Sequence, residues 1–478
     1  MTGVLSVVEI SNGLSEGSLT SIDVLEQCLE RLEEINPTIN AVITINPLAK
    51  ADAQASDERR RSKTSLGPLD GVPITVKDNL LVGGLRATWG TRLYENYIPD
   101  HDEMPVAALR RAGAIILGKT NVSEFTVGGF TDNPVFGVTR NPLDIALTPG
   151  GSSGGAVAAI AAGIAPLALA TDGSGSIRRP AAHTGLVGFK PSLGRIPRGG
   201  GFPVILGDFE VVGPIAANVA DVILAMGVLG KPEHQDRNFQ LREHRGVEDS
   251  TDSLPRLRIL AVEQIGDAPV DPAIRSSFRE MVNLLTRLGH VVESGPLPFY
   301  IGATGAWSEQ FVSLGMARFS LQHPDFAKLV SQQFVEAARN SEGRNPSDLN
   351  HAILAFRAEV SRAYKMFDAI VTPTTAAQPW PVEFQYPREI DGIAAGPRGH
   401  AIFTGWVNAA GHPAISIPIA SDDLGLPIGA QFITDFGEDQ LALKFALEVE
   451  GALAYRQIAT SFEQTSQGMR RSNASHAG

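Results

Sequence analysis

The feature that most constrains the fold of this 478-residue chain is an uncharged stretch, residues 145–171, rich in alanine, glycine and small aliphatic side chains. A stretch of this kind belongs either in a membrane or in a buried core. Pro149 and Pro166 interrupt it, and its continuously apolar part is shorter than the roughly 20 residues of a spanning helix. It therefore predicts a buried helix at 156–162 and a buried strand at 167–171.

Helical and strand patterns alternate around this stretch. The pattern indicates helices at 20–36, 48–60, 106–112 and 271–288, and strands at 72–77, 114–117, 257–262, 368–371 and 414–418. Thr20 resembles a helix cap, and Asn36-Pro37 is expected to end the first of these helices. Such alternation predicts an α/β fold, a large single domain with a central mixed β-sheet covered by helices on both faces.

Composition excludes several classes of protein. The net charge of −12 argues against a nucleic-acid surface. Cys28 is the only cysteine, which rules out an intramolecular disulfide and fits a reducing, cytoplasmic compartment; its apolar neighbours predict that it is buried. The N-terminus shows no signal peptide, and no membrane association is expected. The histidines are scattered without metal-ligand spacing, so neither a metal nor a cofactor is expected.

Ser176 lies in a glycine-bearing turn, residues 173–176, between a predicted buried strand and a predicted helix. Such a turn can direct consecutive N–H groups and the positive end of the helix at one point. A hydroxyl beside it would then have an oxyanion site. Taken alone, the segment fits equally well a serine that only caps the helix.

Residues 148–155, which include Ser152 and Ser153, allow two other hypotheses. A phosphate loop would need a following Gly-Lys-Ser/Thr, which is missing. The order G-x-S-x-G around Ser153 matches a nucleophile elbow, but the preceding Thr-Pro-Gly is poor strand material. That class also needs a histidine, and the candidates have no recognisable context: His290, His351, His400 and His412.

Lys77 ends a buried apolar strand. A lysine has a pKa of about 10.4 in water, and burial without a carboxylate lowers that value until the neutral amine can act as a base. Strand alternation points the neighbouring Asp78 to the other face. Taken alone, Lys77 is equally compatible with a strand-end lysine that reaches solvent.

In combination these segments resemble the amidase signature family, which uses a Ser–Ser–Lys triad. The resemblance covers 67–79, with the lysine strand, 113–125, Asn141-Pro142, the Gly/Ser loop and the Ser176 turn, and it runs closely from about 67 to 215. It reappears at 367–374 and 410–418 and ends at Gly429-Ala430-Gln431. It implies an amidase signature domain at 1–463, with a helical part at 1–65, a catalytic core at 66–230 and a variable substrate-covering region at about 300–400. The Ser/Gln/Asn/Arg-rich tail, 464–478, is expected to be disordered.

The resemblance also implies roles. Ser176 would be the nucleophile, Ser152 a bridging serine after a cis peptide bond, and Lys77 the base. The N–H groups of Gly173, Ser174, Gly175 and Ser176 would form the oxyanion hole, and Ser153, Asp172 and Arg178 would fix the loop. Candidates for the substrate pocket are Gly129, Phe130, Trp307 and Phe311.

The implied activity is hydrolysis of a small, linear carboxylic amide through a seryl acyl-enzyme. The expected partner is the small-molecule substrate, and a homodimer is left open. The absence of an obvious basic cluster favours a neutral or aromatic amide. The alternative is the catalytic A subunit of a tRNA-dependent amidotransferase, but residues 202–210 lack the Ser-Leu-Asp-Gln run associated with it. A catalytically silent relative is disfavoured because the whole triad is present. Ser174, where glycine is usual, and Asp70, where histidine is frequent, depart from the family pattern.

Overall fold

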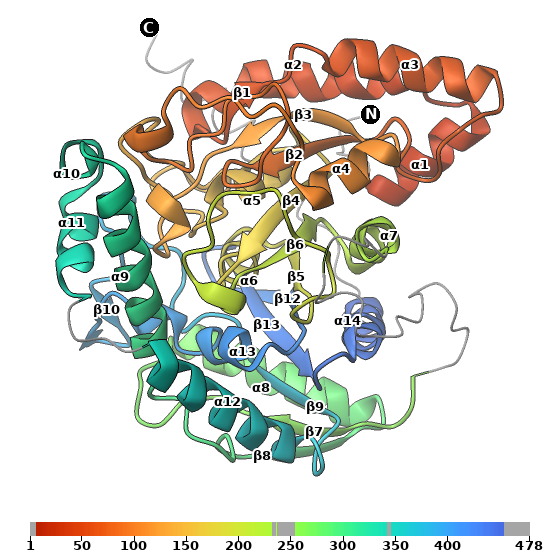
Figure 1. Ribbon diagram of the computed structural model, residues 1–478. Helices are drawn as coiled ribbons and strands as arrows, with labels where there is room; N and C mark the ends of the chain where they lie inside the picture. The colour runs from red at the N-terminus through yellow and green to blue at the C-terminus, as the bar shows by residue number, and fades with distance from the viewer. Residues whose placement is uncertain (1–5, 232–235, 237–253, 342–345, 454–478) are drawn as a thin grey trace, which may run out of the picture.

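A mixed β-sheet runs through the centre of the molecule (Figure 1). The computed structural model describes residues 6–231, 236, 254–341 and 346–453, and within them this sheet has eleven strands. In spatial order they are β1 (Val42–Ile45), β3 (Ile115–Thr120), β2 (Pro73–Lys77), β4 (Leu167–Asp172), β6 (Val211–Ala216), β5 (Val187–Lys190), β12 (Ala414–Ser421), β13 (Pro427–Thr434), β9 (Ala369–Pro373), β7 (Arg258–Ala261) and β8 (Val291–Ser294). A separate short hairpin pairs β10 (Glu389–Ile390) with β11 (Ile393–Ala394).

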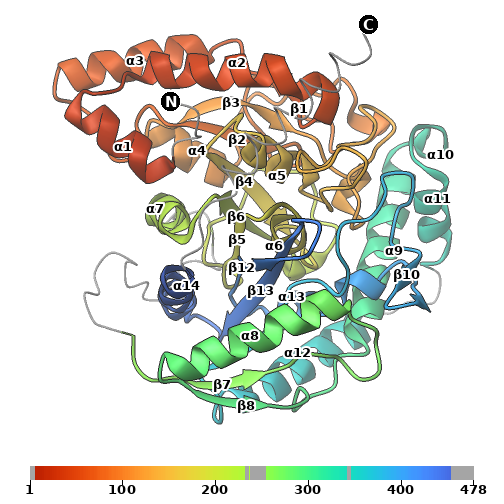
Figure 2. The same ribbon diagram turned by 180° about the vertical axis from the view of Figure 1, so that it is seen from behind.

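Helices cover both faces of the large sheet (Figures 1 and 2). One face packs on α1 (Val7–Glu16), α4 (Met104–Arg111), α7 (Val219–Leu229), α8 (Pro272–Arg287) and α14 (Asp439–Leu453). The other packs on α2 (Ser21–Ile39), α3 (Ala49–Arg61), α5 (Gly154–Ala161), α6 (Arg178–Thr184), α12 (Pro346–Ala363) and α13 (Gly405–Ala410). The remaining helices, α9 (Thr304–Gln322), α10 (Phe326–Leu329) and α11 (Gln332–Arg339), lie together at one side (Figure 1). The predicted fold class is confirmed.

The period of two along β4 assigns its side chains to opposite faces. Leu167 and Leu169 enter the large core that contains α7, whereas Ala168 and Ala170 enter the cluster formed with α5 and α6. Strands β2 and β4 are adjacent and parallel, so their carboxyl ends meet at one edge of the sheet. The ends of the two strands, Lys77 and Asp172, are therefore brought close together.

From Thr148 onward the uncharged stretch is almost entirely buried, as predicted, and it supplies α5 and nearly all of β4; Ile145 and Ala146 are exposed. None of the helices in the described ranges is long and apolar enough to cross a membrane. Cys28 is buried, and burial raises the pKa of its thiol to about 12. The tail at 464–478 and nearly all of the polar segment at 231–254 lie outside the described residues.

One predicted boundary is wrong. Helix α2 continues through Pro37 and ends at Ile39, with Asn40 in the left-handed conformation as its cap. A proline this close to the end removes only one N–H from the last turn. The side chain of Asn36 accepts hydrogen bonds from the N–H groups of Ala41 and Val42, and these bonds hold the departing chain.

Candidate active site

Lys77 is fully buried at the end of β2 and meets only neutral acceptors. Its Nζ lies 2.9 Å from Ser152 Oγ, 3.0 Å from Thr171 Oγ1 and 3.1 Å from the Thr171 carbonyl oxygen. Throughout the described ranges, no carboxylate lies within ion-pair distance of this amine. The environment is therefore the one in which an uncharged amine is favoured.

Burial lowers the pKa of Lys77 to about 7. More distant charges act against one another, since Glu210 and Asp172 raise this pKa and Arg198 lowers it. Near neutral pH a large share of the amine is thus unprotonated and able to take a proton from the Ser152 hydroxyl.

Asp78, the next residue, points away from Lys77 as strand alternation predicts. Its carboxylate accepts from Lys119 Nζ at 3.1 Å and from the Thr88 hydroxyl and N–H at 2.5 and 2.9 Å. It is buried with these partners and leaves Lys77 without a counter-ion.

The Gly/Ser loop presents Ser152 to Lys77. The Gly151–Ser152 peptide bond is cis, as the family resemblance implies, and Ser152 is fully buried. Thr131 binds the Gly/Ser loop at two points: its hydroxyl donates to the Gly150 carbonyl at 2.8 Å and accepts from the Gly154 N–H at 3.0 Å.

The nucleophile-elbow hypothesis for Ser153 fails. No strand precedes Ser153, whose hydroxyl donates to the Thr171 carbonyl at 3.3 Å. The four candidate histidines bond elsewhere: His290 to Glu448, His351 to a backbone carbonyl, His400 to Arg179 and His412 to a backbone carbonyl and Asp435.

Ser176 lies in the turn between β4 and α6 and is 6% exposed. The residue at the cap position of α6 is Ile177, so Ser176 is not the helix cap. Among the described residues, no hydrogen bond joins the hydroxyls of Ser152 and Ser176. A proton relay between the two hydroxyls would need a bond that forms when substrate is present, since catalytic hydrogen bonds are often long or missing in apo structures.

The backbone donors of this turn are not equivalent. Gly175 N–H donates to Asp172 Oδ1 at 2.6 Å, so this expected oxyanion donor is occupied. The N–H groups of Gly173, Ser174 and Ser176 have no acceptor within the part of the chain that is described. Three of the four expected donors are therefore free to meet an oxyanion.

An ion pair between Asp172 and Arg178 stabilises the turn that carries Ser176. Both are fully buried, and Arg178 Nε and Nη2 reach the two carboxylate oxygens at 3.0 Å. Burial would raise the pKa of Asp172, but the Arg178 charge and hydrogen bonds hold it well below its usual range. Asn408 adds bonds to the Asp172 carbonyl at 2.8 Å and to Arg178 at 2.6 Å, and Gln431 accepts from Arg178 at 2.8 Å.

Three residues of the site, Thr171, Asn408 and Thr404, were not found from the sequence. Thr171 contacts Lys77, and Thr404 donates to the Ser174 carbonyl at 2.8 Å. Asn408 and Thr404 lie more than 200 positions from the turn, where no local pattern identifies them. Thr171 immediately precedes Asp172 on β4, and a hydroxyl at the end of this strand was the one local feature that could have identified it as a site residue.

The four pocket candidates divide into two groups. Phe130 packs with Trp380 and Val382, and a Cβ on Gly129 would collide with His400 Nε2 and lie 2.9 Å from Arg179 Nη1. Trp307 and Phe311 of α9 pack in a different cluster. That cluster includes Leu206, the side chain that a Cβ on Gly173 would strike. Both groups thus border the loops around the turn.

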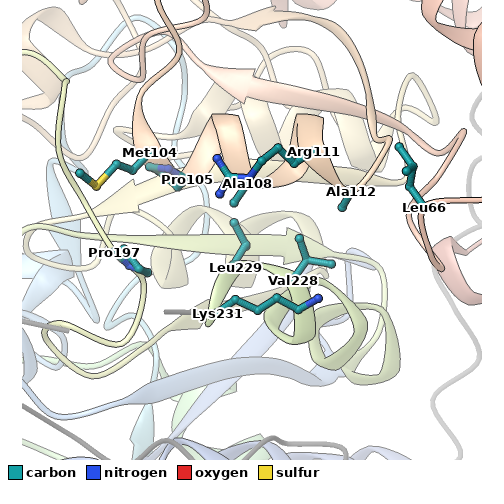
Figure 3. Close-up of a pocket in the computed structure, with 10 residues that line it drawn as sticks. All are labelled: Leu66, Met104, Pro105, Ala108, Arg111, Ala112, Pro197, Val228, Leu229 and Lys231. Carbon is teal, nitrogen blue, oxygen red and sulfur yellow. The ribbon is translucent and has the colours of Figure 1, made fainter. Parts of the chain in front are cut away.

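A cavity of about 200 Å³ lies between α4 and α7, and Figure 3 shows the residues that line it. It is lined by Leu66, Met104, Pro105, Ala108, Arg111, Ala112, Pro197, Val228, Leu229 and Lys231. None of these residues is a triad candidate or its hydrogen-bond partner, so the cavity is no part of this site.

The two departures from the family pattern have structural partners. Asp70 is buried and accepts from Arg59 of α3 at 2.5 Å and from the Leu66 N–H at 3.0 Å. Ser174 is not strained: the positive φ of the turn, +110°, falls on Gly175. The Ser174 hydroxyl accepts from Arg398 at 3.4 Å.

Comparison with known proteins agrees with this geometry. A family described as Amidase matches residues 23–443. The chain is 32% identical to the A subunit of the glutamyl-tRNA(Gln) amidotransferase of Symbiobacterium thermophilum, covering 96% of this chain and 98% of that protein. It is 33% identical to an indoleacetamide hydrolase of Bradyrhizobium diazoefficiens, covering 94% and 87%.

A solved structure of a bacterial aryl acylamidase of the amidase signature family superposes with a TM-score of 0.88 at 25% identity, covering 97% of this chain and 98% of that one. Fold, family match and relatives agree along nearly the whole chain. The chain therefore belongs to the amidase signature family, whose hydrolases act on amide C–N bonds.

Proposed function

We propose that this chain is an amidase that hydrolyses a small, linear carboxylic amide through a seryl acyl-enzyme. Ser176 is the nucleophile, Ser152 the relay and Lys77 the base. The observation that carries the proposal is the 2.9 Å contact from a fully buried amine, without a carboxylate partner, to the Ser152 hydroxyl. A neutral amine is a base, whereas an ion-paired lysine is not.

The first half of the reaction forms the acyl-enzyme. Ser176 Oγ attacks the amide carbonyl carbon, its proton passes to Ser152 Oγ, and the Ser152 proton passes to Lys77. The carbonyl oxygen becomes an oxyanion, which the free N–H groups of Gly173 and Ser174 stabilise. The C–N bond then breaks, and the proton returns along the same relay to the leaving nitrogen.

The second half uses water. Water attacks the ester carbon and gives a proton to the relay; the Ser176–acyl bond then breaks, the relay returns that proton to Ser176 Oγ, and the carboxylic acid is released. Asp172, Arg178 and Ser153 do not touch the reacting atoms; they hold the turn and the loop in position.

Ser176→Ala tests the proposal. Purified wild type should release ammonia or amine from members of a panel of aryl, aliphatic and amino-acid amides, and Ser176→Ala should abolish this with an unchanged circular dichroism spectrum. Intact-mass spectrometry of a rapidly quenched reaction should show an acyl adduct on wild type. Unchanged turnover by Ser176→Ala would overturn the assignment.

A second candidate is the glutaminase component of a tRNA-dependent amidotransferase, which the similarity to the glutamyl-tRNA(Gln) amidotransferase favours. The sequence of residues 202–210 argues against it. If the chain by itself hydrolyses no amide but releases ammonia from glutamine when the other components of such a complex are added, this candidate replaces the first.

Three further expectations stay predictions: a cytoplasmic location, a homodimer and a domain that ends near residue 463. Cell fractionation, analytical ultracentrifugation and limited proteolysis with mass mapping test them in turn.

A further inference from the structure

Arg179 is a buried cation without a carboxylate. It is 5% exposed, its Nη1 donates to His400 Nε2 at 2.8 Å, and its Nε reaches the Gly175 carbonyl at 3.4 Å. Across the described ranges, no carboxylate lies within 4.0 Å of this guanidinium. An arginine in this position is unusual, because a buried charge is costly unless it is paired.

The neighbours of Arg179 do not neutralise it. A guanidinium only donates, so His400 Nε2 must be the acceptor and the imidazole is neutral. Burial, followed by the Arg179 charge, holds the pKa of His400 well below its usual value. Asp172 is the carboxylate that favours the charged form of Arg179 most, but it is already bonded to Arg178. The positive charge of Arg179 is therefore not balanced by a neighbouring carboxylate.

A second cation stands beside the first. Arg398 Nη2 donates to Ser174 Oγ at 3.4 Å, and its Nη1 donates to the Gly305 carbonyl at 3.4 Å. Its side chain is 43% exposed, and its one carboxylate neighbour in the described chain, the exposed Glu309, is 3.6 Å away. Burial lowers the pKa of Arg179, and the Arg398 charge lowers it further, so each guanidinium lies in the field of the other.

This pair lies at the nucleophile. Arg179 bonds to Gly175 and Arg398 to Ser174, the two residues immediately before Ser176. The backbone of Gly129 packs close to Arg179, where a Cβ would lie 2.9 Å from Nη1. The serine that departs from the family pattern is the one that holds Arg398. The exposed Arg398 and the buried Arg179 therefore create a positive electrostatic potential that extends from the surface to the Ser176 hydroxyl.

We propose that Arg179 and Arg398 form a subsite for an anionic group of the substrate, so that the preferred amide carries a carboxylate. This rests on the proposed amidase function and deepens it. It replaces the expectation of a neutral or aromatic amide, which came from the lack of a basic cluster in the sequence. Folding assembles the cluster from positions more than 200 residues apart. The net charge of the chain is −12, so most of its surface repels anions, and an anion is attracted to a local cationic site such as this one.

The test compares two amides of similar size, succinamate, which carries a carboxylate, and butyramide, which is neutral. Wild type should show the higher kcat/KM for succinamate. The ratio of the two kcat/KM values should fall by about ten-fold in Arg398→Gln and by more in Arg179→Gln, because a charge-assisted bond is lost. Arg388→Gln is the matched control, since Arg388 is also exposed but stacks on Phe384. It should leave the ratio unchanged.

Succinate binding to Ser176→Ala, measured by calorimetry, gives a readout that needs no turnover. Adding Arg398→Gln should weaken it about ten-fold. A wild-type preference for butyramide, or a ratio and a succinate affinity that do not change in Arg398→Gln, would overturn the subsite. Arg398 is exposed, so this variant decides even if Arg179→Gln fails to fold. If wild type hydrolyses no amide, the proposed function fails, and succinate binding alone then decides the subsite.

Discussion

Two neighbouring parallel strands, β2 and β3, each deliver a fully buried lysine to the same edge of the sheet. Lys119 on β3 contacts the carboxylate of Asp78 at 3.1 Å. Lys77 on β2 contacts two hydroxyls and a carbonyl. Residue type, depth and strand context are shared; only the partners differ.

The partners decide the chemistry. Burial lowers the pKa of both amines, but for Lys119 the Asp78 carboxylate opposes that effect. Lys119 is thereby half of a structural ion pair, whereas Lys77 is the base that we propose. The difference arises where the chain leaves β2, because Asp78, the first residue after the strand, directs its carboxylate to Lys119 and not to Lys77. A buried lysine is a catalytic candidate only when its counter-ion is missing.

Lys77→Met should have the largest effect on activity. Methionine fills similar volume but cannot take a proton, so kcat/KM for amide hydrolysis should fall about 10³-fold, within the range for losing a general base. The free energy of unfolding should not fall, because a lysine whose pKa is lowered to about 7 by burial opposes folding at neutral pH. Steady-state kinetics and urea denaturation measure the two. A variant that loses less than ten-fold would place Lys77 with Lys119 as a structural residue.

Lys119→Met should lower the free energy of unfolding more than it lowers activity. It leaves Asp78 as a buried carboxylate without its cation, which costs about 3–5 kcal/mol of folding free energy. Urea denaturation measures the loss, and adding Asp78→Asn should restore part of it. If Lys119→Met is as stable as wild type, the ion pair does not stabilise the fold and the contrast between the two lysines loses its basis.

The short segments that we propose carry the triad each have a local pattern: an apolar strand that ends in lysine, a Gly/Ser loop and a glycine turn after a strand. Each alone also fitted an ordinary structural role, and only their combination, through its resemblance to one family, indicated the catalytic roles. Asn408, Gln431, Thr404 and Arg398 could not be predicted, since they reach the turn only through the sheet order and α13. The occupied Gly175 N–H was missed for a similar reason: the Asp172 side chain folds back onto its own turn, and no spacing signals this. Pro37 was misjudged because, in the last turn of a helix, a proline removes only one hydrogen bond to the preceding turn and need not end the helix there.

The pH dependence of kcat/KM tests whether Lys77 is the lysine that takes part in turnover. The relay needs neutral Lys77, whose pKa is about 7, so kcat/KM should rise about ten-fold per pH unit below 7 and level off above it. Initial rates from pH 5 to 9.5 check it. A rate that still climbs steeply above pH 9 would contradict a depressed pKa.

Thr171→Val should have the smallest effect. It removes the hydroxyl that meets Lys77 at 3.0 Å and Asn79 at 3.1 Å while keeping the side-chain shape. One neutral hydrogen bond contributes about 1 kcal/mol, so kcat/KM should fall about five-fold. Kinetics on the variant measure this. A loss as large as that of Lys77→Met would mean that Thr171, and not Ser152, carries the proton.

The central claim is that Lys77 is poised between its charged and neutral forms. The most direct measurement is an NMR titration of the ¹³Cε resonance of Lys77 in lysine-labelled protein, assigned by its disappearance in Lys77→Met. We expect a midpoint near pH 7, set by burial without a carboxylate. A midpoint near 10.5, the ordinary value for lysine, would show that the amine is charged at neutral pH and would contradict its role as the base.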